Sequence, residues 1–341
     1  MKFDVVIGNP PYQEEAAGNN TAGLPIYHYF MEEAYKLSSK VELITPARFL
    51  FNAGQTPKSW NEKMLNDPHL IVNYYEQDSS KIFSNTDIKG GVAITYRDTN
   101  KKFEPIKTFT SYEELGTINK KAGPDTIEDS LTSIIYTQSK FNLEALYQIH
   151  PEFRKIIGSN GQDKRFRNNI FEKIPVFTDD RKSDDDIKVL GLMNMKRIYK
   201  YIPKAFVEME HENINNYKVL VPLSNGSGAI GEVLSTPLIG TPLSGYTQTF
   251  FGIGAFDTVD EAENCLKYIK SKFARAMLGI LKVTQHNKRE TWKKVPIQNF
   301  TSNSDIDWTK SIPEIDQQLY KKYDLSKEEI NFIETRVKEM D

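Results

Sequence analysis

Residues 3–13 read Phe3-Asp4-Val5-Val6-Ile7-Gly8-Asn9-Pro10-Pro11-Tyr12-Gln13, an apolar segment that leads directly into a rigid turn. The apolar and β-branched part is typical of a strand that is covered on both faces in a parallel sheet. Pro10 and Pro11 fix φ and hold the residues before them extended, so the strand ends in a loop. Ligands of open α/β sheets bind at the carboxyl ends of strands. We therefore expect the side chain of Asn9, the carbonyl of Pro10 and the ring of Tyr12 to share a site.

A helix and a second strand come after this turn. Apolar residues recur at helical spacing from Ile26 to Leu37, and Val41-Glu42-Leu43-Ile44 has the composition of a strand. The pattern predicts a β-loop-α-β unit. Residues 14–24 between the turn and the helix are polar and rich in glycine, and they are a candidate lid beside the site.

Asn-Pro-Pro-Tyr after this strand resembles the catalytic motif of amino-group DNA methyltransferases, in particular the N6-adenine enzymes of type II restriction-modification systems. The resemblance implies a catalytic turn formed by Asn9, Pro10, Pro11 and Tyr12. Asn9 and the Pro10 carbonyl would accept hydrogen bonds from the adenine amino group while its nitrogen attacks the methyl group of S-adenosylmethionine. The adenine must first leave the duplex, and Tyr12 offers a ring on which it can stack. Without the resemblance, the motif could be an ordinary turn at the end of a strand.

The resemblance extends to residues 81–96. In similar adenine methyltransferases a phenylalanine ahead of the next strand packs on the flipped base, and Phe83 matches that position. A core position is an equal alternative for Phe83. Arg48, in a segment similar to the family's second strand end, could reach a phosphate or form a surface ion pair.

The strand pattern stops between Thr99 and Lys107, where we expect a domain boundary. The predicted fold is α/β: residues 1–104 form a partial Rossmann-like methyltransferase sheet, the carboxyl-terminal half of a catalytic domain. Residues 105–341 form a mixed α+β target-recognition domain that binds DNA and ends in helices. Ser326 with Glu329 three residues later predicts the start of the last helix.

Three clusters in the second region mix basic and aromatic residues, as surfaces that track DNA phosphates do. A solvated charged face is the alternative for each of them. The candidate DNA-binding residues in these clusters are Lys164, Arg165, Arg167, Lys196, Arg197, Lys288 and Arg289.

Two glycine-rich segments could be mistaken for cofactor loops. Residues 226–231 fit a dinucleotide fingerprint, but Pro237 and Pro242 interrupt the segment after it, so we expect a plain loop. Residues 250–254, Phe-Phe-Gly-Ile-Gly, are spelled like a methyltransferase cofactor loop, but we expect a strand before a helix at residues 259–273.

Composition places further limits on the function. Of the 341 residues 39% are hydrophobic and 26% charged, as in globular proteins, and the net charge of -2 does not by itself indicate DNA binding. The single cysteine, Cys265, excludes a disulfide framework, and no metal-binding constellation is apparent around the separate His150, His211 and His286. No apolar run is long enough to span a membrane, so we expect a cytoplasmic protein.

In non-permuted adenine methyltransferases the cofactor motifs precede the catalytic strand, which begins here at residue 3. We therefore expect most of the S-adenosylmethionine site to lie in a preceding segment or a partner subunit. The expected partners are double-stranded DNA, that cofactor-binding part and a restriction nuclease. The alternative function is a non-catalytic DNA-binding specificity subunit of a restriction-modification system.

Overall fold

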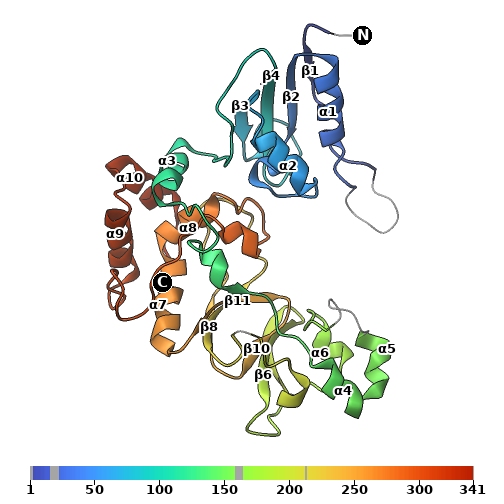
Figure 1. Ribbon diagram of the computed structural model, residues 1–341, viewed down its shortest axis with the longest axis vertical. Helices are drawn as coiled ribbons and strands as arrows, with labels where there is room; N and C mark the ends of the chain where they lie inside the picture. The colour runs from blue at the N-terminus through green and yellow to red at the C-terminus, as the bar shows by residue number, and fades with distance from the viewer. Residues whose placement is uncertain (1–2, 16–22, 158–163, 212, 341) are drawn as a thin grey trace.

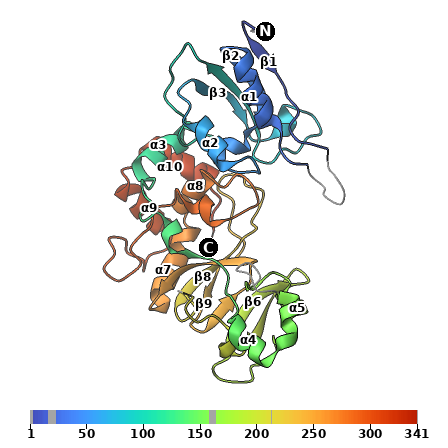
Figure 2. The same ribbon diagram turned by 45° about the vertical axis from the view of Figure 1, so that its right-hand side comes forward.

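The computed structural model describes residues 3–15, 23–157, 164–211 and 213–340. These residues form a mixed α/β fold with three sheets and ten α-helices (Figure 1). The amino-terminal sheet lies at one end of the elongated molecule and the sheet with β6 at the other, in both views (Figures 1 and 2). No helix in the described ranges has the length and apolarity that crossing a membrane requires.

The amino-terminal unit is built on one four-stranded sheet in the order β1-β2-β4-β3. Its strands are β1 (Val6–Gly8), β2 (Lys40–Pro46), β3 (Leu70–Glu76) and β4 (Val92–Asp98). β1 pairs with β2 in parallel across the helix α1 (Tyr27–Leu37), which confirms the predicted β-loop-α-β unit. β4 is antiparallel to both β2 and β3, so the sheet is mixed.

One face of this sheet is packed and the other is largely open. Helix α1 and helix α2 (Lys58–Leu65) cover the first face, where Met31 and Met64 join Val41, Leu43 and Ala93 in a core. Phe3, Val5 and Ile7 are 48%, 47% and 72% exposed, so the prediction of a strand covered on both faces is wrong. Ile7 lies within β1, Phe3 and Val5 precede it, and β1 is an edge strand of the described sheet.

The middle of the molecule is a larger core in which a second four-stranded sheet, β5-β11-β8-β9, meets helices. Its elements are β5 (Ile135–Tyr136), β8 (Tyr217–Pro222), β9 (Leu238–Gly240), β11 (Phe250–Phe256), α3 (Glu113–Ala122), α7 (Val259–Lys270), α8 (Lys272–Gly279), α9 (Ile312–Lys322) and α10 (Lys327–Arg336). β11 confirms the predicted strand at residues 250–254, and α7 confirms the helix predicted from residue 259, which ends at Lys270 before a second helix, α8, begins. Ser326 and Glu329 form the predicted capping box of α10.

The far end carries a third core around a three-stranded sheet, β10-β6-β7. Its elements are α4 (Leu143–Ile149), α5 (Arg154–Ile157), α6 (Ile170–Lys173), β6 (Ile187–Met193), β7 (Lys196–Ile202) and β10 (Ser244–Tyr246). Short 3-10 helices connect the elements: η1 (Ala47–Phe51), η2 (Ser79–Lys81), η3 (Leu131–Ile134), η4 (Pro151–Phe153), η5 (Lys204–Phe206) and η6 (Arg289–Trp292).

Candidate functional site

The Asn9 turn opens into a large cleft with a volume of about 1660 Å³. Asn9 directly follows β1, and Pro46 and Arg48 stand at the carboxyl end of the parallel strand β2. Both strand ends line the cleft, as expected for a ligand site in an open α/β sheet. Asn9 is exposed and Pro10 is half-buried, so polar groups of the turn are accessible from the cleft.

The turn is fastened to the start of α1 by backbone hydrogen bonds. Ile26 donates its N–H to the carbonyl of Tyr12 at 3.1 Å, and Glu14 donates to the carbonyl of Leu24 at 2.9 Å. Residues 16–22 of the predicted lid lie outside the described residues. The pairing holds Tyr12 beside the cleft, where burial raises the pKa of its hydroxyl to about 12.

Phe83 lines the same cleft as Asn9 and Tyr12, although it is far from both in sequence. The loop that carries it is ordered around the buried Ser79. The hydroxyl of Ser79 accepts the N–H of Ile88 at 2.8 Å, and its carbonyl accepts the N–H of Phe83 at 2.8 Å. Phe83 is half-buried, so part of its ring is free to contact a ligand.

The third basic cluster is the one that reaches this cleft. Lys288 is exposed and lines it, together with Gln285, His286, Lys293 and Lys294. Arg289 is also exposed, but its Nε donates to the carbonyl of Thr132 at 3.0 Å and it is not among the cleft residues.

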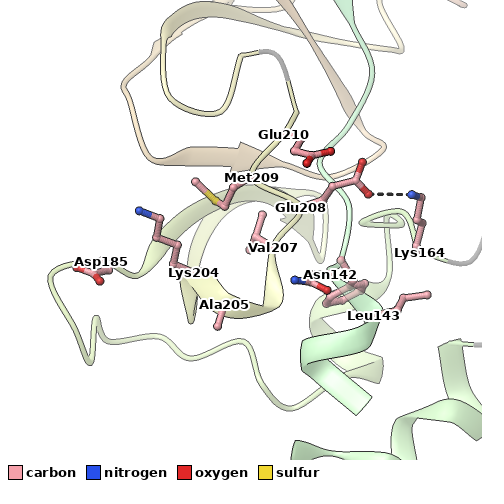
Figure 3. A pocket seen from close by; sticks show the side chains of 11 residues that line it. Asn142, Leu143, Lys164, Asp185, Lys204, Ala205, Val207, Glu208, Met209 and Glu210 are labelled. Atoms are coloured by element: carbon pink, nitrogen blue, oxygen red, sulfur yellow. Dashed lines mark hydrogen bonds and ion pairs between the residues drawn. The ribbon is translucent and has the colours of Figure 1, made fainter. Parts of the chain in front are cut away.

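The first cluster lies in the far unit and is partly neutralised. Lys164 forms an ion pair with Glu208 at 2.8 Å in a separate pocket of about 800 Å³ (Figure 3). Arg165 is half-buried, and Arg167 is exposed. Phe166 between them is fully buried in the local core, so the aromatic member of this cluster cannot stack on a base.

The second cluster lies on β7 of the far unit. Lys196 is exposed, whereas Arg197 donates to the carbonyls of Thr236 and Ser235 at 2.6 and 2.7 Å. Lys200 is paired with Asp179 at 2.8 Å. Neither this cluster nor the first lines the cleft that contains Asn9.

Other basic residues of the cleft were not predicted from the sequence. Lys58, Lys89 and Lys107 line it, and with Arg48, Lys288, Lys293 and Lys294 they face only three acidic residues within the described lining, Glu62, Asp87 and Glu290. Lys89 stands just before β4, whose antiparallel direction brings the start of that strand to the carboxyl ends of β1 and β2. A prediction that β4 runs antiparallel to β2 would have indicated Lys89 as a cleft residue. The described lining is therefore basic, in contrast to the net charge of -2 for the whole chain.

The glycine-rich candidates do not line the cleft as cofactor loops. Phe250, Phe251 and Ile253 are at most 3% exposed and lie within β11. Residues 226–231 form a loop, as predicted, whose Gly228 carbonyl accepts a hydrogen bond from Gln77 at 3.1 Å. In the part of the chain that the structure describes, no group of three or more His, Cys, Asp or Glu side chains is arranged to hold a metal ion.

Comparison with known proteins agrees with the resemblance at the amino terminus. An uncharacterized adenine-specific methylase of Mycoplasma pneumoniae is 33% identical over 95 residues, which are 27% of this chain and 22% of that protein. The type IIL restriction-modification enzyme MmeI, in a structure with DNA, aligns with 97% of this chain and 56% of its own at 9% identity and a TM-score of 0.47. The chain thus spans about a fifth of the first relative and about half of the second. Residues 1–83, which carry the Asn9 turn, match the model of the Eco57I restriction-modification methylase family, so the resemblance to restriction-modification methylases is confirmed for this part of the chain.

Proposed function

We propose that this chain is the catalytic-turn and target-recognition portion of a site-specific DNA adenine N6-methyltransferase. The observation that carries the proposal is the position of the Asn9 turn at a strand end, inside a cleft with a basic lining. A cleft of about 1660 Å³ is large enough for a flipped nucleotide, and its lysines and Arg48 suit the phosphates on either side.

The chain's own groups would bind and orient the target base. The amide oxygen of Asn9 and the carbonyl of Pro10 accept hydrogen bonds from the two hydrogens of the adenine amino group. The lone pair of the amino nitrogen is normally delocalised into the adenine ring, which makes this amine a poor nucleophile. Hydrogen bonds to both of its hydrogens keep electron density on the nitrogen and make it more reactive. Tyr12 and Phe83, which line the same cleft, supply ring faces for the base.

S-adenosylmethionine is the methyl donor that the family implies, and the described residues do not form a complete site for it. The one segment spelled like its glycine-rich loop, residues 250–254, is buried inside β11 and lies away from the cleft. We therefore propose that a preceding segment or a partner subunit binds most of the cofactor. Double-stranded DNA is the proposed partner of the basic surfaces.

The test is methyl transfer to unmethylated mixed-sequence duplex DNA by the chain assembled with its cofactor-binding portion. Asn9→Ala is expected to lower single-turnover formation of N6-methyladenine at least ~100-fold, because the amine loses one of its two acceptors. Its duplex affinity, measured by fluorescence anisotropy, should stay close to that of the wild type. Gln55→Ala removes another exposed amide of the cleft lining and is the matched control, with an expected rate near wild type.

A second candidate is a specificity subunit that binds DNA without chemistry. The burial of residues 250–254 favours it, because this chain then offers no glycine-rich cofactor loop in the described cleft. If Asn9→Ala methylates at the wild-type rate, the catalytic proposal fails and this second candidate is preferred.

A further inference from the structure

Two cationic side chains and a histidine from distant parts of the sequence line the same cleft. Arg48 follows β2 directly, whereas His286 and Lys288 belong to the loop that precedes η6, and all three line the cleft. Burial lowers the pKa of His286, and the charges of Lys288 and Arg48 lower it further. All three side chains therefore face the same cleft.

The stem of Arg48 is held in a fixed position by two glycine loops. Gly54 and Gly90 have φ of +87° and +86°, and a Cβ on them would lie 3.3 Å from the Cβ and 2.9 Å from the Cγ of Arg48, respectively. The Nε of Arg48 donates to the carbonyl of Lys89. Within the described residues its two terminal nitrogens form no hydrogen bond. The guanidinium is thus positioned with the N–H donors of both terminal nitrogens unused.

The loop that carries His286 and Lys288 is anchored by the residue between them. Asn287 is fully buried, accepts a hydrogen bond from Trp292 Nε1 at 2.9 Å and donates to the Pro222 carbonyl at 3.3 Å. Its backbone N–H donates to the carbonyl of Leu223 at 2.8 Å. The flanking His286 and Lys288 are exposed. Their backbone is therefore fixed while their side chains remain accessible.

We propose that Arg48, His286 and Lys288 together bind one phosphate of the DNA backbone beside the adenine held at the Asn9 turn. None of the three forms an ion pair with a carboxylate of the described residues, so Lys288, His286 and the terminal nitrogens of Arg48 are available to an anion in the cleft. A guanidinium fork and a nearby ammonium group match the oxygens of a phosphate diester. The choice of DNA as the source of the phosphate rests on the proposed function.

The imidazole of His286 reports on the site directly. In NMR spectra of the full chain with labelled histidine, assigned with the variant His286→Gln, the pKa of His286 should rise when mixed-sequence duplex binds at low salt. A duplex with neutral methylphosphonate linkages should leave it unchanged. Inorganic phosphate alone should raise it only at much higher concentration, because it lacks the rest of the duplex contacts.

Variants distinguish binding of a phosphate at this site from non-specific electrostatic attraction between the chain and DNA. Lys288→Gln should reduce the duplex-induced pKa shift and make the slope of log affinity against log salt shallower by at most about 0.9, because Arg48 still contacts the same phosphate. Arg48→Lys keeps the charge without the fork and should also weaken the shift. Lys102→Gln, at an exposed position that does not line the cleft, is the control and should change neither quantity. If the packed Arg48 variant does not fold, the exposed Lys288 variant still decides.

The proposal is overturned if duplex binds but leaves the pKa of His286 unchanged. It is also overturned if inorganic phosphate raises that pKa and duplex does not, which would indicate a site for a free phosphate. Asn9→Ala, which tests the methyl-transfer proposal, should give the same His286 shift as the wild type. The two proposals can therefore fail independently.

Discussion

At the residue scale, Tyr12 lies between the core of the sheet unit and the cleft. Its ring packs against that core and lines the cleft, and its buried hydroxyl has no hydrogen-bond partner in the described structure. A buried hydroxyl without a partner costs about 1–3 kcal/mol, so it is a poor choice for stability alone. Such a group beside a cleft is consistent with a role in ligand binding.

The variants Tyr12→Phe and Tyr12→Ala distinguish the contribution of the Tyr12 ring to base flipping from that of its hydroxyl. Once the methylated position is mapped, a fluorescent base analogue placed there reports how much of the base is extrahelical. Tyr12→Ala should weaken flipping by about 1–3 kcal/mol, because a stacking surface is lost. Tyr12→Phe keeps the ring and should retain the wild-type signal, with equal or higher thermal stability. An unchanged signal in Tyr12→Ala would contradict the stacking role.

Sequence patterns located the turn better than they located the DNA surface. Asn9 and Phe83 were assigned from motifs to one site, and the structure brings both to one cleft, although their roles remain proposals. Lys164 and Arg197 are predicted from local clusters of basic and aromatic residues. Their partners, Glu208 for the first and the carbonyls of residues 235 and 236 for the second, come from distant segments that a local pattern does not reveal.

At the element scale, β1 shows that a short apolar run in the sequence predicts a strand but not the neighbours that cover it. The run predicted a strand, which is found at Val6–Gly8, but not how many of its faces are covered. Periodicity cannot identify the neighbouring element, and in the described sheet β1 pairs only with β2. This edge strand presents unpaired backbone groups beside two exposed apolar side chains, Ile7 within the strand and Val5 just before it.

We expect this edge to drive self-association of the isolated chain. Sedimentation velocity should show mass increasing with protein concentration, and Ile7→Lys should reduce the associated fraction several-fold, because a charge on an edge strand opposes pairing. Tyr74→Lys, a 45% exposed position on the opposite edge strand β3, is the matched control and should associate like the wild type. A monomeric wild type at all concentrations would contradict the expectation.

At the scale of the whole molecule, the cleft depends on contacts between parts that are far apart in sequence. Val283, from the carboxyl-terminal region, is buried in the core of the amino-terminal sheet unit, and Gln77 donates to the carbonyl of Gly228. The predicted boundary near residue 104 remains a prediction. It could not anticipate that a later loop returns to complete the cleft wall, because that return is a tertiary contact without a local signature.

The same arrangement predicts how this chain alone should respond to S-adenosylmethionine. Residues 250–254, the only segment spelled like its glycine-rich loop, are a buried strand, and a Cβ at Gly254 would lie 2.0 Å from the ring of Phe256. Opening that strand for a ligand would expose Phe250, Phe251 and Ile253, at a cost of several kcal/mol of burial. Isothermal titration calorimetry of the isolated chain should therefore detect no saturable binding up to about 100 μM cofactor, which corresponds to a free energy weaker than about -5.5 kcal/mol. Binding at low micromolar affinity would mean that the chain holds a cofactor site of its own, and a proposed cofactor-binding partner would then be unnecessary.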